Sequence, residues 1–148
     1  MTLKVDFYVL DGADAQHRLT YACRLIEKAV TQGLTVCVCL TTAAEARDFD
    51  ALLWSFSDRS FVPHAIASEG SPAIAGSAPL TPVWLTLSAN VNTDLLVNLC
   101  ADVPSNFKSY ARLAEFVDAE PARREAGRRR FAHYRDAGYP PETHRVTA

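Results

Sequence analysis

Short apolar runs alternate with helical repeats in the first third of the chain. Residues 5–10 are almost continuously apolar and are followed by Asp11 and Gly12, a pattern typical of a strand buried on both faces. From about 14 to 32 the apolar side chains recur at helical spacing, and Gly33 follows where a C-terminal cap is expected. The opening of the chain therefore predicts a buried strand followed by an amphipathic helix.

The same order then repeats. Residues 34–40 are apolar and β-branched, Thr41 or Thr42 is a suitable N-cap, and 44–56 form a second helical pattern. Strands that alternate with helices in this way favour an α/β fold with a parallel sheet and right-handed crossovers.

The rest of the chain completes one domain, for which no linker or repeat suggests a division. Residues 57–81 are richer in Ser, Gly and Pro and are predicted to form a long connection. Further short strands are expected at 83–87, 94–99 and 112–117, then a C-terminal helix over about 121–138 and a short tail over 139–148. We therefore expect residues 1–148 to form a single domain with a mostly parallel sheet of about five strands, flanked by helices.

Composition and charge are ordinary overall but uneven along the chain. The 148 residues are 49% hydrophobic, enough for one core, and the net charge of -2 does not indicate extensive phosphate binding. Residues 121–148, however, hold seven arginines and three acidic residues, a net charge of +4, against -6 for residues 1–120. This basic end indicates either a local anionic partner or a solvated helix face.

The apolar runs also bear on location. None approaches the roughly 20 residues needed to cross a bilayer, and the first six residues lack the apolar region of a signal peptide. We expect a cytoplasmic protein with no membrane partner. Cys37 and Cys39 lie too far apart along the predicted strand for an easy disulfide and are expected to be reduced core thiols.

The patterns that catalysis requires are not evident. The first strand-to-helix turn has neither the glycines of a dinucleotide site nor a phosphate loop, and Asp11 and Asp14 would repel phosphate. The four histidines are scattered, and Cys37 and Cys39 have no second cysteine pair, so neither a metal nor a cofactor is expected. We predict no catalytic residues and favour a binding role.

Two features fit such a role. Large apolar residues continue past the second helix into a loop: Trp54, Phe61, Val62 and Pro63. They are either tucked into the core or exposed as a protein-binding patch.

The second feature is the last helix, where a rotation of 100° per residue places Arg124, Arg128 and Arg135 on one stripe beside Phe131. Gly127 and Tyr134 fall on the adjoining stripe. Such a surface suits a short peptide with a carboxylate and an apolar side chain, although a helix that lays its arginines around a packed aromatic edge would give the same pattern.

Eight segments of the chain carry a resemblance to a known family: 7–10, 21–29, 53–54, 60–64, 78–79, 95–99, 116–118 and 130–139. Together they are similar to the chi subunit family of bacterial DNA polymerase III over essentially the whole chain. The most specific are Ser-Phe-Val-Pro-His at 60–64 and Tyr-Arg-Asp-Ala-Gly-Tyr at 134–139.

The resemblance implies a Rossmann-like domain without nucleotide chemistry that serves as a non-catalytic replisome adaptor. It implies a one-to-one heterodimer with the psi subunit, and through psi a place in the clamp-loader complex, by way of Trp54, Phe61, Val62 and Pro63. It also implies a pocket for the acidic, phenylalanine-terminated tail of single-stranded-DNA-binding protein, formed by Val117, Arg124, Arg128, Phe131, Tyr134 and Arg135. Some family members also serve a helicase, and no direct DNA binding is expected.

Some relatives have a lysine where this chain has Ala132 and a tyrosine where it has Phe131, which predicts a slightly less polar pocket here. Two other functions remain as alternatives. One is a nucleotide-dependent or hydrolytic enzyme on a Rossmann-like sheet, and the other is a direct nucleic-acid binder that uses the Arg-rich C-terminal helix. Neither accounts for the apolar residues between Trp54 and Pro63.

Overall fold

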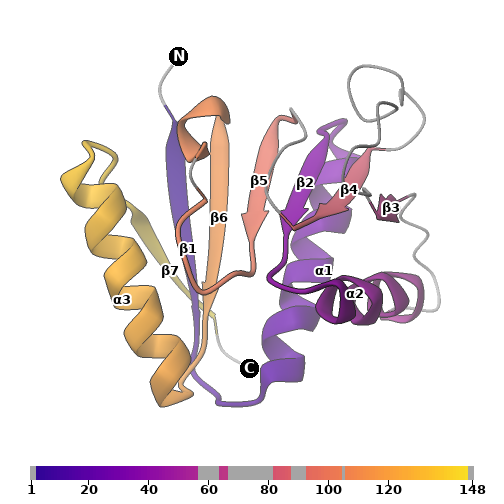
Figure 1. The fold of residues 1–148 in the computed structure, drawn as a ribbon, viewed down its shortest axis with the longest axis horizontal. Helices are drawn as coiled ribbons and strands as arrows, with labels where there is room; N and C mark the ends of the chain where they lie inside the picture. The colour runs from indigo at the N-terminus through magenta and orange to yellow at the C-terminus, as the bar shows by residue number, and fades with distance from the viewer. Residues whose placement is uncertain (1–2, 57–63, 67–81, 88–92, 105, 147–148) are drawn as a thin grey trace.

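Strands and helices alternate in the first third of the described chain and again at its C-terminal end, with four described strands in succession between these parts (Figure 1). The computed structural model describes residues 3–56, 64–66, 82–87, 93–104 and 106–146, with only the backbone of 64–66. The elements are β1 (Lys4–Leu10), α1 (Ala15–Thr31), β2 (Val36–Cys39), α2 (Ala43–Ser55), β3 (His64–Ile66), β4 (Val83–Thr86), β5 (Leu95–Asn98), a 3₁₀ turn (Phe107–Ser109), β6 (Arg112–Val117), α3 (Pro121–Asp136) and β7 (Glu142–Val146).

The described strands form one sheet of seven in the order β3-β4-β2-β5-β6-β1-β7, and every neighbouring pair is parallel. The predicted α/β class is confirmed, but the sheet is wider than the expected five strands. The two additional strands, β3 and β7, lie at opposite edges, in segments expected to be a connection and a tail. β7 is mostly polar and partly exposed, and its pairing with β1 rather than its own pattern makes it a strand.

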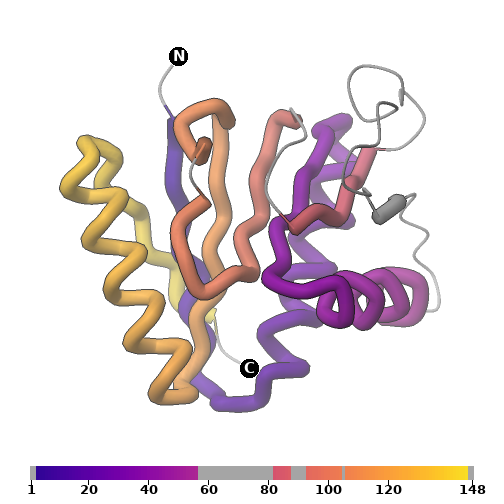
Figure 2. The backbone as a smooth tube through the Cα atoms, viewed as in Figure 1, coloured from indigo at the N-terminus to yellow at the C-terminus, as the bar shows by residue number. Residues whose placement is uncertain are grey.

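Helices cover both faces of the sheet. α1 and α2 pack on one face, where Ile26, Phe49 and Leu53 are buried against strand residues such as Val38 and Phe116. α3 packs on the other face over β1 and β6, with Tyr134 buried among Phe7, Phe107 and Leu113. Figure 2 shows α3 and α2 at opposite ends of the sheet.

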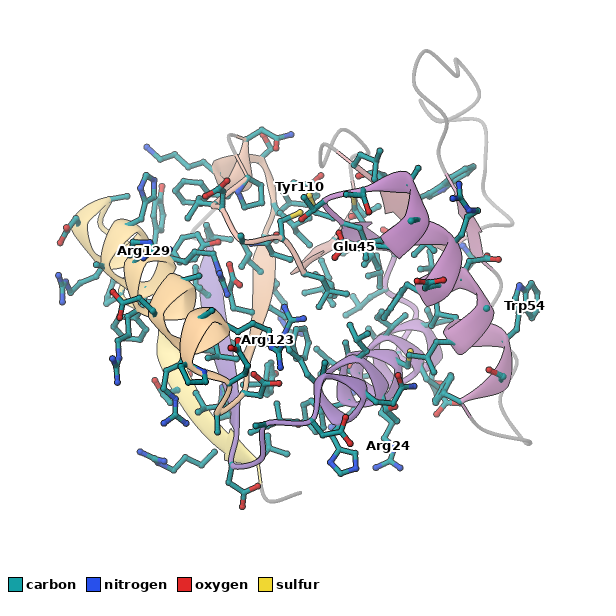
Figure 3. All side chains as sticks on the ribbon, turned by 60° about the horizontal axis from the view of Figure 1, so that its bottom comes forward. Arg24, Glu45, Trp54, Tyr110, Arg123 and Arg129 are labelled. Atoms are coloured by element: carbon teal, nitrogen blue, oxygen red, sulfur yellow. The ribbon has the colours of Figure 1, made fainter. Side chains whose placement is uncertain are left out.

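The helix starts follow the expected chemistry. Asp14 accepts a hydrogen bond from the Gln16 amide, and Thr42 forms a capping box with Glu45. Glu120 caps α3 just before Pro121. Since parallel strands share a direction, these three helix N-termini all lie near the carboxyl edge of the sheet, the edge that Figure 3 brings forward.

Gly33 and Gly138 end α1 and α3. Their φ angles of 85° and 97° lie in the left-handed region that favours glycine, so both act as helix stops.

No helix in the described part of the chain is both long enough and apolar enough to span a membrane. In the same part, none of the four cysteines is in a disulfide, and Cys37 and Cys39 are buried.

Candidate peptide-binding site

A cavity of about 280 Å³ lies between α3 and the strands β1, β6 and β7. We call it the α3 groove. It is lined by Phe7, Val9, Val117, Arg124, Gly127, Arg128, Phe131, Thr143 and Arg145.

The floor of the α3 groove is apolar because α3 lies very close to β6. A Cβ added to Gly127 would lie 2.7 Å from Cγ2 of Val117, so the helix approaches as closely as only glycine permits. Phe131 then meets Phe7 edge to face, with ring centroids 5.2 Å apart. Strand and helix together leave a hollow suited to an apolar side chain.

The rim of the α3 groove is cationic. The described residues that line it include Arg124, Arg128 and Arg145 but no carboxylate. Arg128 is 70% exposed and 3.6 Å from Glu125, whereas Arg124 and Arg145 make no ion pair within the described chain. An apolar hollow with unpaired guanidinium groups suits a ligand that carries a carboxylate next to an apolar group.

The structure brings together four of the six residues expected in the tail pocket: Val117, Arg124, Arg128 and Phe131. Tyr134 is fully buried and donates a 2.6 Å hydrogen bond to Glu115, and exposed Arg135 lies 3.2 Å from Asp136. Neither lines the α3 groove.

Sequence reasoning missed Thr143 and Arg145. Both are on β7, which pairs Phe7 with Thr143 and Val9 with Arg145 and so places them on the face that α3 covers. The signal available was the excess of arginine in residues 121–148, which already included Arg145. Because no strand was predicted there, the sequence could not place Arg145 beside the arginines of the last helix.

Behind the α3 groove, Glu115 holds a buried polar cluster. Its carboxylate accepts hydrogen bonds from Asn98 Nδ2 at 2.8 Å, Arg130 Nε at 2.9 Å and Tyr134 Oη at 2.6 Å. Burial raises the pKa of Glu115, and the Arg130 guanidinium opposes that shift. The cluster joins β5, β6 and α3 in the core.

The arginines of α3 therefore divide between two sides of the helix. Arg123 makes two 2.9 Å hydrogen bonds to Asp118, and Arg130 is paired with Glu115. Arg130 is buried and Arg123 is partly exposed, and a carboxylate neutralises each, so the helix does not present its whole charge to one partner.

Trp54 lies in the last turn of α2 and is 48% exposed. Figure 3 shows its side chain directed away from the body of the protein, at the end opposite α3. The other residues of the expected psi surface, Phe61, Val62 and Pro63, lie outside the described residues.

The carboxyl edge of the sheet, where α/β proteins commonly bind nucleotides, holds a second cavity of about 420 Å³. Carboxylates already occupy the helix N-termini nearby: those of Asp14, Glu45 and Glu120 accept backbone N–H groups or belong to a capping box. A polyphosphate would meet these negative charges where it needs open amides.

One group of potential metal ligands occurs in the described chain: Asp6, Glu142 and His144 have ligand atoms within 4.8 Å of one another. His144 Nε2 lies 2.8 Å from Asp6 Oδ1, and the Lys4 ammonium lies 3.9 Å from Asp6 and 3.6 Å from Glu142. The Lys4 ammonium thus already balances part of this negative charge, and Asp6 is hydrogen-bonded to His144.

The parallel sheet and its helices define a Rossmann-like α/β protein, and solved structures share this fold. The crystal structure of T4 UvsW matches with a TM-score of 0.66 at 10% identity over 98% of this chain and 42% of that one. An S. cerevisiae Dbp5 variant bound to RNA and ADP-BeF3 matches with a TM-score of 0.57 at 11% identity, over 97% of this chain and 41% of that one. The chain thus spans less than half of these proteins, and the likeness concerns the fold alone.

Sequence comparison defines the family. The family model for the DNA polymerase III chi subunit, HolC, matches residues 1–142. DNA polymerase III subunit chi of Pseudomonas aeruginosa is 41% identical over 145 residues, 97% of this chain and 96% of the relative. The same subunit of Escherichia coli is 27% identical, over 90% of this chain and 91% of the relative. The chain belongs to the DNA polymerase III chi subunit family and is a replication accessory subunit.

Proposed function

We propose that this protein is a non-catalytic adaptor that binds the psi subunit of the clamp loader and the acidic C-terminal tail of single-stranded-DNA-binding protein. The observation that carries the proposal is the α3 groove, in which three arginines surround an apolar floor. A tail that ends in phenylalanine presents an apolar ring, a terminal carboxylate and neighbouring acidic side chains. The ring enters against Val117 and Phe131, and the carboxylates pair with the rim.

Trp54 supports the psi interaction. Aromatic side chains at interfaces often contribute roughly 2 kcal/mol or more to binding, and Trp54 is one of two large hydrophobic side chains exposed in the described chain. Figure 3 shows Trp54 at the end of the molecule opposite α3, so the two partners do not compete for one surface.

Arg128→Glu tests the tail interaction. The substitution removes a charge-assisted hydrogen bond and introduces a repulsion, so we expect binding of a fluorescent acidic peptide ending in phenylalanine to weaken at least tenfold, about 1.4 kcal/mol. Fluorescence polarisation measures this effect. Wild-type affinity should also fall between about 0.1 and 1 M salt, as the Debye length shrinks from about 10 to 3 Å.

Arg129→Glu is the matched control. Arg128 and Arg129 are both 70% exposed and both approach Glu125, but only Arg128 lines the α3 groove. Arg129→Glu should reduce the affinity for the peptide by less than about threefold, since it changes only the long-range charge. Equal losses in the two variants would mean that the peptide senses overall charge rather than this groove, and the assignment would be wrong.

A further inference from the structure

The cavity at the carboxyl edge of the sheet plays no part in either proposed partner interaction. Its volume of about 420 Å³ falls within the range of about 300–1,000 Å³ typical of small-molecule sites. It lies between the N-terminal parts of the three helices and the ends of β2 and β5, and Figure 3 shows Glu45 on α2 and Arg123 on α3 on either side of this region. Its walls are largely apolar, with Leu19, Leu40, Phe49 and Leu99 among them.

Arg18 is the unusual group in this cavity. It is only 9% exposed, and its Nε donates a 2.8 Å hydrogen bond to the Phe116 carbonyl, which fixes the orientation of the guanidinium. Within the described residues its two Nη groups donate no hydrogen bond and no carboxylate lies within ion-pair distance. Neither Nη group is among the side-chain atoms of the described residues that are both buried and without a hydrogen-bond partner, so both remain accessible to solvent. The Nη groups therefore open into the cavity that Arg18 lines.

The nearby carboxylates are engaged elsewhere. Glu115 is bonded to Arg130, and Asp118 is bonded to Arg123. Both attract Arg18 only at longer range, whereas burial and the Arg130 charge lower the pKa of Arg18. A buried guanidinium without a counter-ion is costly, and an anion from outside would relieve that cost.

The charge around the cavity limits what the anion can be. Glu45 and Asp48 lie exposed on the lining opposite the arginines, and they would repel a phosphate dianion or a polyphosphate. A carboxylate carries a single charge and matches the parallel donors of a guanidinium. We propose that this cavity binds a small monocarboxylate with an apolar body, its two oxygens held by the Nη groups of Arg18 and its body against Leu19, Phe49 and Leu99.

Benzoate is a suitable probe, with benzyl alcohol as its neutral counterpart and phenyl phosphate as the dianion. We expect benzoate to bind saturably to the full-length protein and to shift backbone amide signals of Arg18, Phe49 and Leu99 in two-dimensional NMR. The affinity for benzyl alcohol should be at least about tenfold lower than that for benzoate, because benzyl alcohol cannot form the charge-assisted hydrogen bonds. Phenyl phosphate should also bind more weakly than benzoate.

Because the α3 groove also offers arginines and Phe131 to benzoate, the titration is repeated with Arg128→Glu. The response of the cavity residues must persist in that variant, so this test and that of the tail interaction fail independently. Absence of saturable binding, or shifts confined to the α3 groove, would overturn the proposal.

Arg18→Gln should weaken benzoate binding about tenfold or more, while Arg24→Gln, on an exposed position of the same helix, should leave it unchanged. Should Arg18→Gln fail to fold, Ala126→Leu fills the cavity from α3 without altering the guanidinium and should weaken benzoate binding by a similar factor. Undiminished binding in a folded Arg18→Gln or Ala126→Leu protein would place benzoate elsewhere and refute the assignment.

Discussion

At the scale of single residues, the buried pair of Glu115 and Arg130 should matter more to stability than any exposed ion pair of α3. Arg130 is 4% exposed and Glu115 is fully buried. Arg130→Met would leave a buried carboxylate without its cation, which typically costs about 3–5 kcal/mol. Arg129→Met, one position away and 70% exposed, should change the free energy of unfolding by less than about 0.5 kcal/mol. Urea denaturation of both variants makes the comparison.

The free energy of unfolding that Arg130→Met loses should increase as the pH rises. Burial already raises the folded-state pKa of Glu115, and removing the guanidinium raises it further. A carboxyl whose folded pKa exceeds its unfolded pKa lowers stability as pH rises from the unfolded value towards the folded one. Arg130→Met should thus lose more stability at about pH 8 than at about pH 5, and a loss independent of pH would contradict the proposed role of Glu115.

The sequence alone does not show which side of α3 faces the sheet. A helical stripe can be read from spacing, but the spacing does not say which stripe faces inward. Tyr134 was expected at the tail pocket and is buried on the Glu115 side instead, because α3 turns Gly127 towards Val117 and Phe131 towards Phe7. The pairing of Arg130 with Glu115 could not be predicted either, since Glu115 lies fifteen residues earlier, on a strand.

At the scale of elements, the close approach of α3 to β6 is open to test through Gly127→Ala. Alanine gains about 1 kcal/mol of helix propensity over glycine, but its Cβ would lie 2.7 Å from a methyl group of Val117, a stiff β-branched side chain. Overpacking of this kind costs about 1–3 kcal/mol, so we expect a net loss of up to about 2 kcal/mol in urea denaturation.

The matched rescue is Gly127→Ala combined with Val117→Ala. Removing the Val117 methyl groups relieves the contact, so the double variant should be more stable than the sum of the two single losses predicts. Strictly additive losses in the free energy of unfolding would show that α3 can shift away from β6 at no energetic cost.

The elements themselves were largely predictable because their signals are local. The continuous apolar strands and the helix stop at Gly33 lie where the sequence pattern placed them, and the N-cap of α2 is Thr42, one of the two threonines expected there. β7 was not predictable, since a polar edge strand depends on its pairing with β1 rather than on its own periodicity.

At the scale of the whole molecule, the fold resembles a nucleotide-binding sheet, but its carboxyl edge is not equipped for phosphates. Asp14, Glu45 and Glu120 stand at the three helix N-termini. We therefore expect isothermal titration calorimetry to detect no saturable binding of ATP, GTP or NAD(P). Micromolar binding of any of these would instead support the enzyme alternative.

The separation of the two proposed surfaces leads to the last prediction, which concerns bridging. Trp54 lies on α2, at one end of the molecule, and the α3 groove lies at the other end (Figure 3). Trp54→Ala and Phe61→Ala should each weaken psi binding by roughly 2 kcal/mol or more yet leave peptide affinity unchanged, because distant sites without shared partners act additively. Arg128→Glu should do the reverse.

Leu87→Ala is the matched control for Trp54→Ala, because both side chains are 48% exposed and apolar. The Leu87→Ala protein should retain psi binding, and all variants should keep the wild-type melting temperature within a few degrees.

The ternary complex can be detected directly by surface plasmon resonance. Psi is immobilised, this protein is bound to it, and the tail peptide fused to a carrier protein is then added. Wild type should capture the carrier, whereas Trp54→Ala should bind the peptide only in solution and Arg128→Glu should bind psi alone. If Trp54→Ala instead lost both partners together with its melting transition, Trp54 would be a structural residue and the psi surface would have to lie elsewhere.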